Sequence, residues 1–459
     1  MTIKDMTVGN PTKLILGFAF PLYIGNLFQQ FYNLADTLIV GRTLGVTSLA
    51  AVGSTGAIAF LVLGFIMGLT SGFSVITAQR FGAKDLSGLK KSFASILVLG
   101  FIFSALLTIM STFFAKPLLE VMNTPANIIH EAHSYIFIMF LGIGTMVFYN
   151  AFSNIIRALG DSKTPLFFLI LASLLNIILD LIFIIKFQMG VTGAGWATVI
   201  AQGVSSIFCL MFMLIKFPVL RLTKPDWQIT QKMLWEHIKI GFPMGFQMSV
   251  MVIGIIALQI VLNSFGSDTV AAFTAATKIE QVGGQPFLAL GVAMATYTAQ
   301  NFGAGKFNRI KLGVARCQKF IVILTLISIC IIIFLGRNAV NLFIVGDYPH
   351  ITQQAQLYMT ILCLFYFCLG SILLYRNVLQ GMSSVKIPFI SGLIELVIRA
   401  VAAFVLAHFF GYLGVCFATP CAWIGGSIWL TFGYYKSIKK LSYAAHPKSD
   451  ELSFLNLNK

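Results

Sequence analysis

The chain has 459 residues, of which 58% are hydrophobic and only 10% carry a charge. Because about a quarter of the residues of a soluble globular domain are charged, this composition excludes a soluble fold and predicts a protein embedded in a lipid bilayer. The formal net charge of +16 would also suit a nucleic-acid-binding protein, so the placement of lysine and arginine has to decide between the two.

Apolar stretches of about 20 residues recur along the whole sequence, and each is long enough as a helix to cross about 30 Å of hydrocarbon. Residues 320–335 and 390–410 are mostly apolar on both faces, which excludes the alternating pattern of a β-barrel strand. The sequence therefore predicts an all-α integral membrane protein with twelve transmembrane helices. They are expected at about residues 13–40, 48–74, 92–115, 132–157, 164–186, 193–216, 233–262, 270–297, 313–335, 355–378, 386–409 and 413–436.

The lysines and arginines lie mainly in every second loop between the predicted helices, as the positive-inside rule describes for cytoplasmic loops. Assigning the N-terminus to the cytoplasm places most of the 31 basic residues on that side. Both termini are thus expected in the cytoplasm, in a multi-pass plasma-membrane protein. The basic excess then reports membrane topology, and we expect no nucleic-acid partner.

Cysteine and histidine form no recognisable ligand pattern. All seven cysteines lie in or near apolar segments without a CxxC pair, and the six histidines lack metal-ligand spacing. The sequence also shows no catalytic constellation of clustered histidines with acids, or of a nucleophile with its base. We therefore expect no cofactor, no metal centre and no enzymatic activity.

One motif is repeated in the two halves of the chain. Residues 77–83 read TAQRFGA, and residues 298–304, which lie 221 positions later, read TAQNFGA. Three further pairs keep nearly the same spacing: Pro21 with Pro243, Asn154 with Asn377, and Thr198 with Thr419. A single offset at four separated places indicates an internal duplication.

The duplication divides the chain into an N-lobe, residues 1–217, and a C-lobe, residues 240–459, which ends in a short cytoplasmic tail. Residues 218–239 are expected to form a cytoplasmic linker and the start of the seventh helix. Because each copy holds an even number of helices, the two six-helix bundles enter the membrane in the same direction and are related by a pseudo-two-fold axis along the membrane normal. Such an architecture suits a transporter that exposes one site alternately to each side.

The first half contains two acidic residues inside predicted helices, where a charge costs at least about 2.5 kcal/mol. Tyr32 and Asp36 are four residues apart and so adjacent on one helix face, and Asn176 and Asp180 repeat that spacing. Carboxylate, amide and phenol groups can hold a proton or bind sodium through oxygen ligands. The alternative is structural, with Asp36 near the outer end of its helix and Asp180 supporting helix packing.

The second half carries polar residues inside the eighth predicted helix, beside glycines and Pro286 that weaken or bend it. A polar and pliable segment is typical of a helix beside a cavity. Lys278 and Glu280 lie two positions apart and cannot share one helix face. We expect a role in substrate binding or C-lobe coupling for Lys278, Glu280, Gln281 and Gln285.

Four other residues are expected to serve structure or gating. Glu395 and Arg399 have the spacing of a helical ion pair, which would lower the cost of burying both charges. Pro21 and Pro243 are expected to kink the first helix of each lobe, either as static bends or as hinges that gate access.

Together these features resemble the multidrug and toxic compound extrusion (MATE) family, especially its DinF-like branch. The resemblance covers nearly the whole chain. The residues that carry it are Pro21, the Tyr32–Asp36 pair, the two AQxFGA segments, residues 157–161 (RALGD) before Pro165, and Asn176 with Asp180.

The resemblance implies multidrug efflux by antiport of cationic or amphipathic organic compounds against sodium or protons. It implies a cation site in the N-lobe, with sodium as one candidate ion at Asp36, Asn176 and Asp180. Tyr32 also belongs to this site. Thr198 is assigned to it on the resemblance alone. A monomer in a bacterial plasma membrane is expected.

Three alternatives remain on the sequence alone. Lys278 and Arg399 would favour an anionic headgroup, so a flippase for a lipid or a lipid-linked anionic molecule is the second interpretation. A membrane enzyme would need the catalytic constellation that the sequence lacks. A passive channel is less compatible with the duplicated plan than alternating access, and saturable, ion-driven flux would distinguish the two.

Overall fold

The computed structural model describes residues 5–341 and 348–445, and within these ranges the chain is almost entirely helical. The first half comprises α1 (Pro11–Leu44), α2 (Val46–Ser54), α3 (Gly56–Gly82), α4 (Leu86–Val121), α5 (Ile129–Leu141), α6 (Ile143–Ala158), α7 (Lys163–Asp180), η1 (Leu181–Lys186) and α8 (Val191–Lys216). The second half comprises η2 (Pro218–Leu220), η3 (Lys224–Trp227), α9 (Gln231–Asn263), α10 (Ser267–Gly303), α11 (Phe307–Asn341), α12 (Pro349–Leu364), α13 (Tyr366–Gly381), α14 (Lys386–Phe410) and α15 (Tyr412–Ala445).

These helices account for all twelve predicted membrane spans. Nine of the described helices are long and apolar enough to cross a membrane, and two bent pairs, α5 with α6 and α12 with α13, raise this number to eleven. The twelfth is α10, a helix of 37 residues whose polar side chains lower its hydropathy. The prediction of an all-α integral membrane protein is thus confirmed.

Three spans are interrupted where the sequence predicted continuous helices. The bent pairs turn by 48° and 50° at their breaks, at Gly142 and Phe365, and Thr55 separates α2 from α3. A Cβ atom at Gly142 would lie 2.2 Å from a methyl carbon of Val199, so the bend brings α8 closer than any side chain would allow. In contrast, α1 and α9 continue through Pro21 and Pro243 as single helices.

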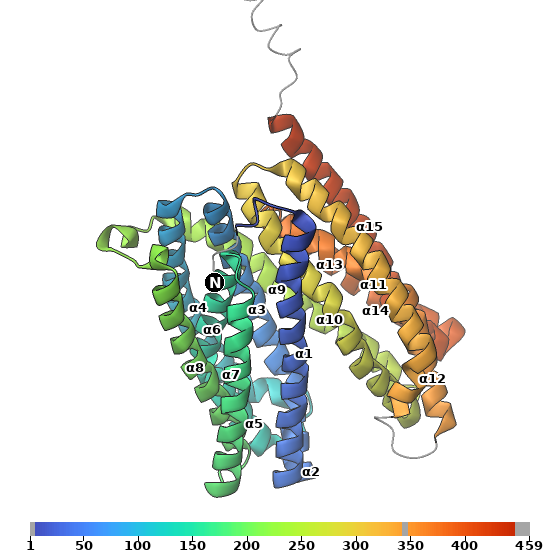
Figure 1. Cartoon of the computed structure of the whole chain (residues 1–459). Coiled ribbons are helices and arrows are strands. Elements are labelled where there is room, and N and C mark those ends of the chain that lie inside the picture. Colours follow the sequence, from blue (N-terminus) through green and yellow to red (C-terminus); the bar gives the residue numbers. More distant parts are fainter. Residues whose placement is uncertain (1–4, 342–347, 446–459) are drawn as a thin grey trace, which may run out of the picture.

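The helices form two groups. Figure 1 shows α1 to α8 on one side of the molecule and α10 to α15 on the other, and the groups diverge toward the end where α2 and α12 lie. The confirmed fold is therefore two six-helix bundles. The exact lobe boundaries remain a prediction, although η2 and η3 do lie in the expected linker, before α9 begins at Gln231.

Glycine faces bring the two bundles into close contact along α3 and α9. A Cβ atom at Gly68 would lie 2.3 Å from the carbonyl oxygen of Met244, and one at Gly72 would lie 2.4 Å from the Cα atom of Gly241. Small residues let helix backbones approach in this way, and van der Waals packing then holds them together. The two lobes thus meet here backbone against backbone.

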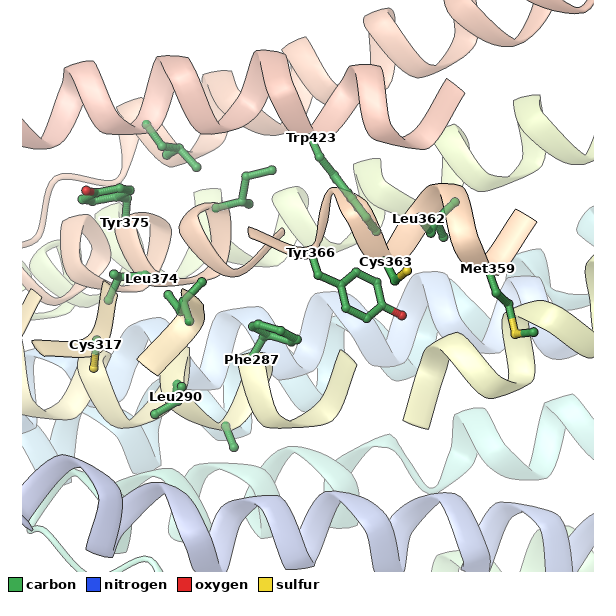
Figure 2. Close-up of a cluster of buried hydrophobic side chains, with 14 of the residues drawn as sticks. Phe287, Leu290, Cys317, Met359, Leu362, Cys363, Tyr366, Leu374, Tyr375 and Trp423 are labelled. Atoms are coloured by element: carbon green, nitrogen blue, oxygen red, sulfur yellow. The ribbon is translucent and has the colours of Figure 1, made fainter. Parts of the chain in front are cut away.

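Aromatic side chains fill the interior of the C-lobe. Tyr366 is 1% exposed, and its ring centroid lies 5.6 Å from that of Phe287 and 6.2 Å from that of Trp423. Figure 2 shows these rings among aliphatic side chains and the thiols of Cys317 and Cys363. This packing joins α10, α13 and α15 into one body.

Asp161 fixes the turn between α6 and α7. Its carboxylate accepts hydrogen bonds from the backbone N–H groups of Lys163 and Thr164, the Thr164 hydroxyl at 2.7 Å and the Lys216 ammonium at 3.0 Å. Burial opposes ionisation, but these hydrogen bonds outweigh it and hold the pKa of Asp161 below its ordinary value. The turn that begins α7 is therefore tied to the end of α8.

Candidate functional site

The five predicted N-lobe residues converge from three helices. Tyr32 and Asp36 project from α1, Asn176 and Asp180 from α7, and Thr198 from α8. Asn176 and Asp180 are 1% and 0% exposed. The structure therefore brings together residues that lie up to 166 positions apart in the sequence, at the place where the resemblance expects a cation site.

The amide of Asn176 links the other members of this N-lobe site. Oriented to satisfy its neighbours, its nitrogen donates to a carboxylate oxygen of Asp180 at 2.9 Å and to the hydroxyl of Tyr32 at 3.2 Å. Its oxygen accepts from both the hydroxyl and the backbone N–H of Thr198, at 3.1 and 3.0 Å. All three helices are thus connected through one side chain.

The carboxyl groups of Asp36 and Asp180 lie within hydrogen-bonding contact of each other. Two carboxylates this close repel each other strongly. Either one of them holds a proton, or a cation binds beside both of them. Each also has one buried oxygen, Oδ1, without a hydrogen-bond partner among the described residues. Two unsatisfied carboxylate oxygens, with the hydroxyl oxygen of Tyr32 nearby, fit either a proton or a sodium ion.

The backbone beside this pair is irregular. Directly after Asp180, residues Leu181–Lys186 form a π-helix instead of continuing α7 as an α-helix. Segments of this kind are rare and are frequent at functional sites, because they change the direction of side chains within a helix. Hydropathy and residue spacing contain no signal for it, so the sequence did not predict it.

A small pocket adjoins the N-lobe site. It lies between α1, α7 and α8 and is partly open to solvent. Polar members of its wall include Gln29, Tyr32 and Asn176. The sequence also missed Tyr135 of α5, which is 9% exposed and interacts electrostatically with Asp36 and Asp180. An isolated tyrosine in an apolar helix gives no sign of this position.

The polar residues of α10 point in different directions. Lys278 and Gln281 are exposed, whereas Gln285 is buried and donates a hydrogen bond to the backbone oxygen of Gln281 at 2.9 Å. Glu280 is partly buried and interacts electrostatically with Arg399. The structure therefore places Glu280 on a different face of α10 from Lys278, as their two-residue spacing requires, while Gln281 and Gln285 lie one turn apart and are hydrogen-bonded.

The predicted ion pair between Glu395 and Arg399 within α14 is wrong, because Glu395 has a different partner. Glu395 pairs with Arg376 of α13, at 2.5 Å, and its same oxygen accepts a hydrogen bond from Ser391 at 2.8 Å. That oxygen is already occupied from the facing helix, and Arg399 packs instead against Gly254 of α9 while keeping a longer-range interaction with Glu395. Both charges are still buried, since Glu395 is 5% and Arg399 is 7% exposed.

The two lobes thus have different electrostatics at corresponding positions. In the duplicated sequence Asn176 aligns with Arg399, and Tyr32 aligns with Gly254, whose missing side chain leaves room for the guanidinium group. The N-lobe site holds two acids, Asp36 and Asp180, that contact each other. The C-lobe centre holds acids and arginines that neutralise one another.

Comparisons with known proteins agree with the duplicated fold. The MatE family model matches the chain twice, at residues 21–182 and 243–405. The probable multidrug resistance protein YpnP of Bacillus subtilis is 33% identical over 314 residues, which cover 68% of this chain and 69% of that protein. The probable multidrug resistance protein YoeA of the same organism is 27% identical over 438 residues, which cover 92% and 93% of the two chains.

Solved structures show the same arrangement. One, described as the outward-facing conformation of a multidrug resistance MATE family transporter of the MOP superfamily, superposes with a TM-score of 0.89. It is 25% identical in sequence, and the match covers 96% of this chain and 99% of that one.

Proposed function

The chain belongs to the MATE family and is a multidrug efflux transporter, and from this premise we propose that it exports cationic or amphipathic organic compounds in exchange for sodium ions or protons. The observation that carries the proposal is the contact between Asp36 and Asp180 inside the N-lobe. The relatives do not support the alternative of a lipid flippase.

The proposed coupling rests on charge. A proton or a sodium ion at the Asp36–Asp180 pair removes the repulsion between two carboxylates, so the ion stabilises the packing of α1 against α7. If the ion binds one lobe arrangement better than the other, it shifts the balance between inward-open and outward-open states. Substrate and ion then occupy the transporter alternately.

The available driving force is adequate for this exchange. One positive charge that crosses 100 mV releases about 2.3 kcal/mol. Since about 1.4 kcal/mol corresponds to a factor of ten, one-to-one exchange with a neutral compound supports a substrate gradient of about fiftyfold. One N-lobe site is therefore sufficient for efflux of a neutral amphipathic compound. One-to-one exchange for a monovalent organic cation moves no net charge, so the concentration gradient of the coupling ion has to drive it.

Other parts of the proposal follow from the polar residues and the basic loops. The exposed side chains of Lys278 and Gln281 would contact the substrate, with Glu280 and Gln285 supporting them from the same helix. Both termini would lie in the cytoplasm, on the side of most lysines and arginines. We propose a monomer in a bacterial plasma membrane that needs no cofactor besides the coupling ion, and we retain the DinF-like branch as a prediction.

Efflux from proteoliposomes tests the central claim. Purified chain would be reconstituted, loaded with a fluorescent organic cation, and given an inward sodium gradient or an inward proton gradient in separate experiments. We expect saturable efflux under at least one gradient and its loss when an ionophore dissipates that gradient. Efflux that neither saturates nor depends on a gradient would indicate a channel and contradict antiport.

Removing the Tyr32 hydroxyl is a milder test of the N-lobe site. The Tyr32→Phe variant loses one hydrogen bond to Asn176, a net change of about 0.5–1.5 kcal/mol, so we expect the coupling-ion concentration for half-maximal efflux to rise about fivefold. The maximal rate should change little. Tyr23→Phe on the same helix is the control, and an equal effect of both variants would remove Tyr32 from the site.

A further inference from the structure

The two copies of the repeated motif lie against each other in the structure. A Cβ atom at Gly82, which ends α3, would lie 2.0 Å from the carbonyl oxygen of Gln300. Reciprocally, a Cβ atom at Gly303, which ends α10, would lie 1.9 Å from the carbonyl oxygen of Gln79. Only glycine fits at either position, because any side chain would collide with backbone that cannot turn away.

The glutamines of the motif each cross to the opposite lobe. Gln79 donates through Nε2 to the carbonyl oxygen of Gly381 and to the hydroxyl of Ser383, both at 2.8 Å. Gln300 donates through Nε2 to the carbonyl oxygen of Ala158, also at 2.8 Å. Ala158 and Gly381 are the last residues of α6 and α13 and are equivalent in the duplication, so each glutamine satisfies a carbonyl left unpaired at a helix end.

The segment before α1 closes over the same place. The backbone N–H of Met6 donates to the side-chain oxygen of Gln300 at 2.8 Å, and the amide of Asn301 donates back to the carbonyl of Met6 at 3.1 Å. Lys306 and Arg309 donate to the carbonyl oxygens of Thr7 and Gly9. The chain that leads into the N-lobe is therefore tied to the C-lobe beside the motif.

We propose that the two TAQxFGA motifs form a latch that holds the lobes together at the predicted cytoplasmic end and must separate before the transporter can open to the cytoplasm. The inference deepens the proposed function and rests on it. The latch joins residues 77–83 of the N-lobe to residues 298–304 of the C-lobe through the two glycine contacts. Each glutamine adds a bridge from its own motif to the opposite lobe, at the end of α13 for Gln79 and of α6 for Gln300. The two motifs contact each other reciprocally, so a substitution in one motif should also loosen the packing of the other.

Hydrogen exchange measured by mass spectrometry tests the latch on the full chain in nanodiscs. Gly303→Ala should raise the exchange rate of backbone amides in residues 79–85, on the opposite lobe, by more than about tenfold, and Gly82→Ala should do the same at residues 300–306. Gly284→Ala is the matched control, because it lies on the same helix as Gly303 and a Cβ atom there meets nothing within 4 Å. It should leave both motifs protected.

Two further variants remove hydrogen bonds without adding atoms. Gln79→Ala and Gln300→Ala should each raise exchange in the partner motif by about tenfold, and their thermal melting reports whether the fold is intact. These variants decide the question if the alanine substitutions at glycine prevent folding. Increased exchange confined to the substituted motif, or no increase beyond that of Gly284→Ala, would overturn the latch.

Gradient-driven efflux by the native chain separates this inference from the proposed function. If the variants raise hydrogen exchange in the opposite motif but the native chain shows no ion-driven efflux, the latch is supported and antiport is contradicted. Ion-driven efflux with no reciprocal exchange would retain antiport and remove the latch.

Discussion

Asp180→Asn is expected to abolish gradient-driven efflux, with a fall in initial rate of about a hundredfold or more. Asp180 is fully buried and contacts Asp36, and the substitution leaves the shape of the site while removing the charge that attracts the coupling ion. A charged hydrogen-bonding group contributes about 1.5–3 kcal/mol, which corresponds to one to two factors of ten. Losing the ion also removes the driving force, so the rate should fall further.

The measurement is the initial rate of dye efflux from proteoliposomes at matched protein content, under sodium and proton gradients in turn. Asp36→Asn should behave like Asp180→Asn, because either change leaves only one acid in the pair. Asp268→Asn is the control, since this acid is exposed in the first turn of α10. Retained efflux in both site variants would show that coupling does not occur in the N-lobe.

Arg376→Met is expected to lower the free energy of unfolding by about 3–5 kcal/mol, because it leaves the buried carboxylate of Glu395 without its ion-pair partner. Arg376 is 4% exposed and Glu395 is 5% exposed, so little solvent is available to compensate. The double variant Arg376→Met with Glu395→Gln removes both charges and should recover most of the lost stability.

Unfolding in mixed micelles, followed by circular dichroism, provides these free energies. Arg316→Met, an exposed position on α11, serves as the control and should change stability by less than about 0.5 kcal/mol. If the double variant were no more stable than Arg376→Met, the ion pair would not explain the loss. A cost below about 1 kcal/mol for Arg376→Met would show that water reaches Glu395.

The fold was largely predictable because membrane spans depend on local hydropathy, and the duplication depends on matched residues at one offset. The family model matches the two halves separately, with starting points 222 residues apart, in agreement with that repeat. Tyr32, Asp36, Asn176 and Asp180 could be found because spacing within a helix places residues on one face. Their role in coupling stays a prediction.

Features that depend on contacts between helices could not be predicted in the same way. Glu395 binds Arg376, nineteen residues away on another helix, in place of Arg399 one turn away, because a facing helix occupies the carboxylate first. The bend at Gly142 depends on the approach of Val199, and the π-helix after Asp180 has no hydropathy signal. Each requires knowledge of which helices are neighbours.

The glycine contact between α3 and α9 can act as a pivot about which the two bundles rotate. Gly68 lies fourteen residues before Gly82 on the same helix, so the distance from this contact to the end of α3 is about 20 Å. A rotation of about 10° would move that end by about 3.5 Å, more than enough to break hydrogen bonds of 2.8 Å. The helix backbones and the rings of Phe65 and Phe73 hold this contact, so a small tilt of the two bundles about it is sufficient to switch the side to which the site opens.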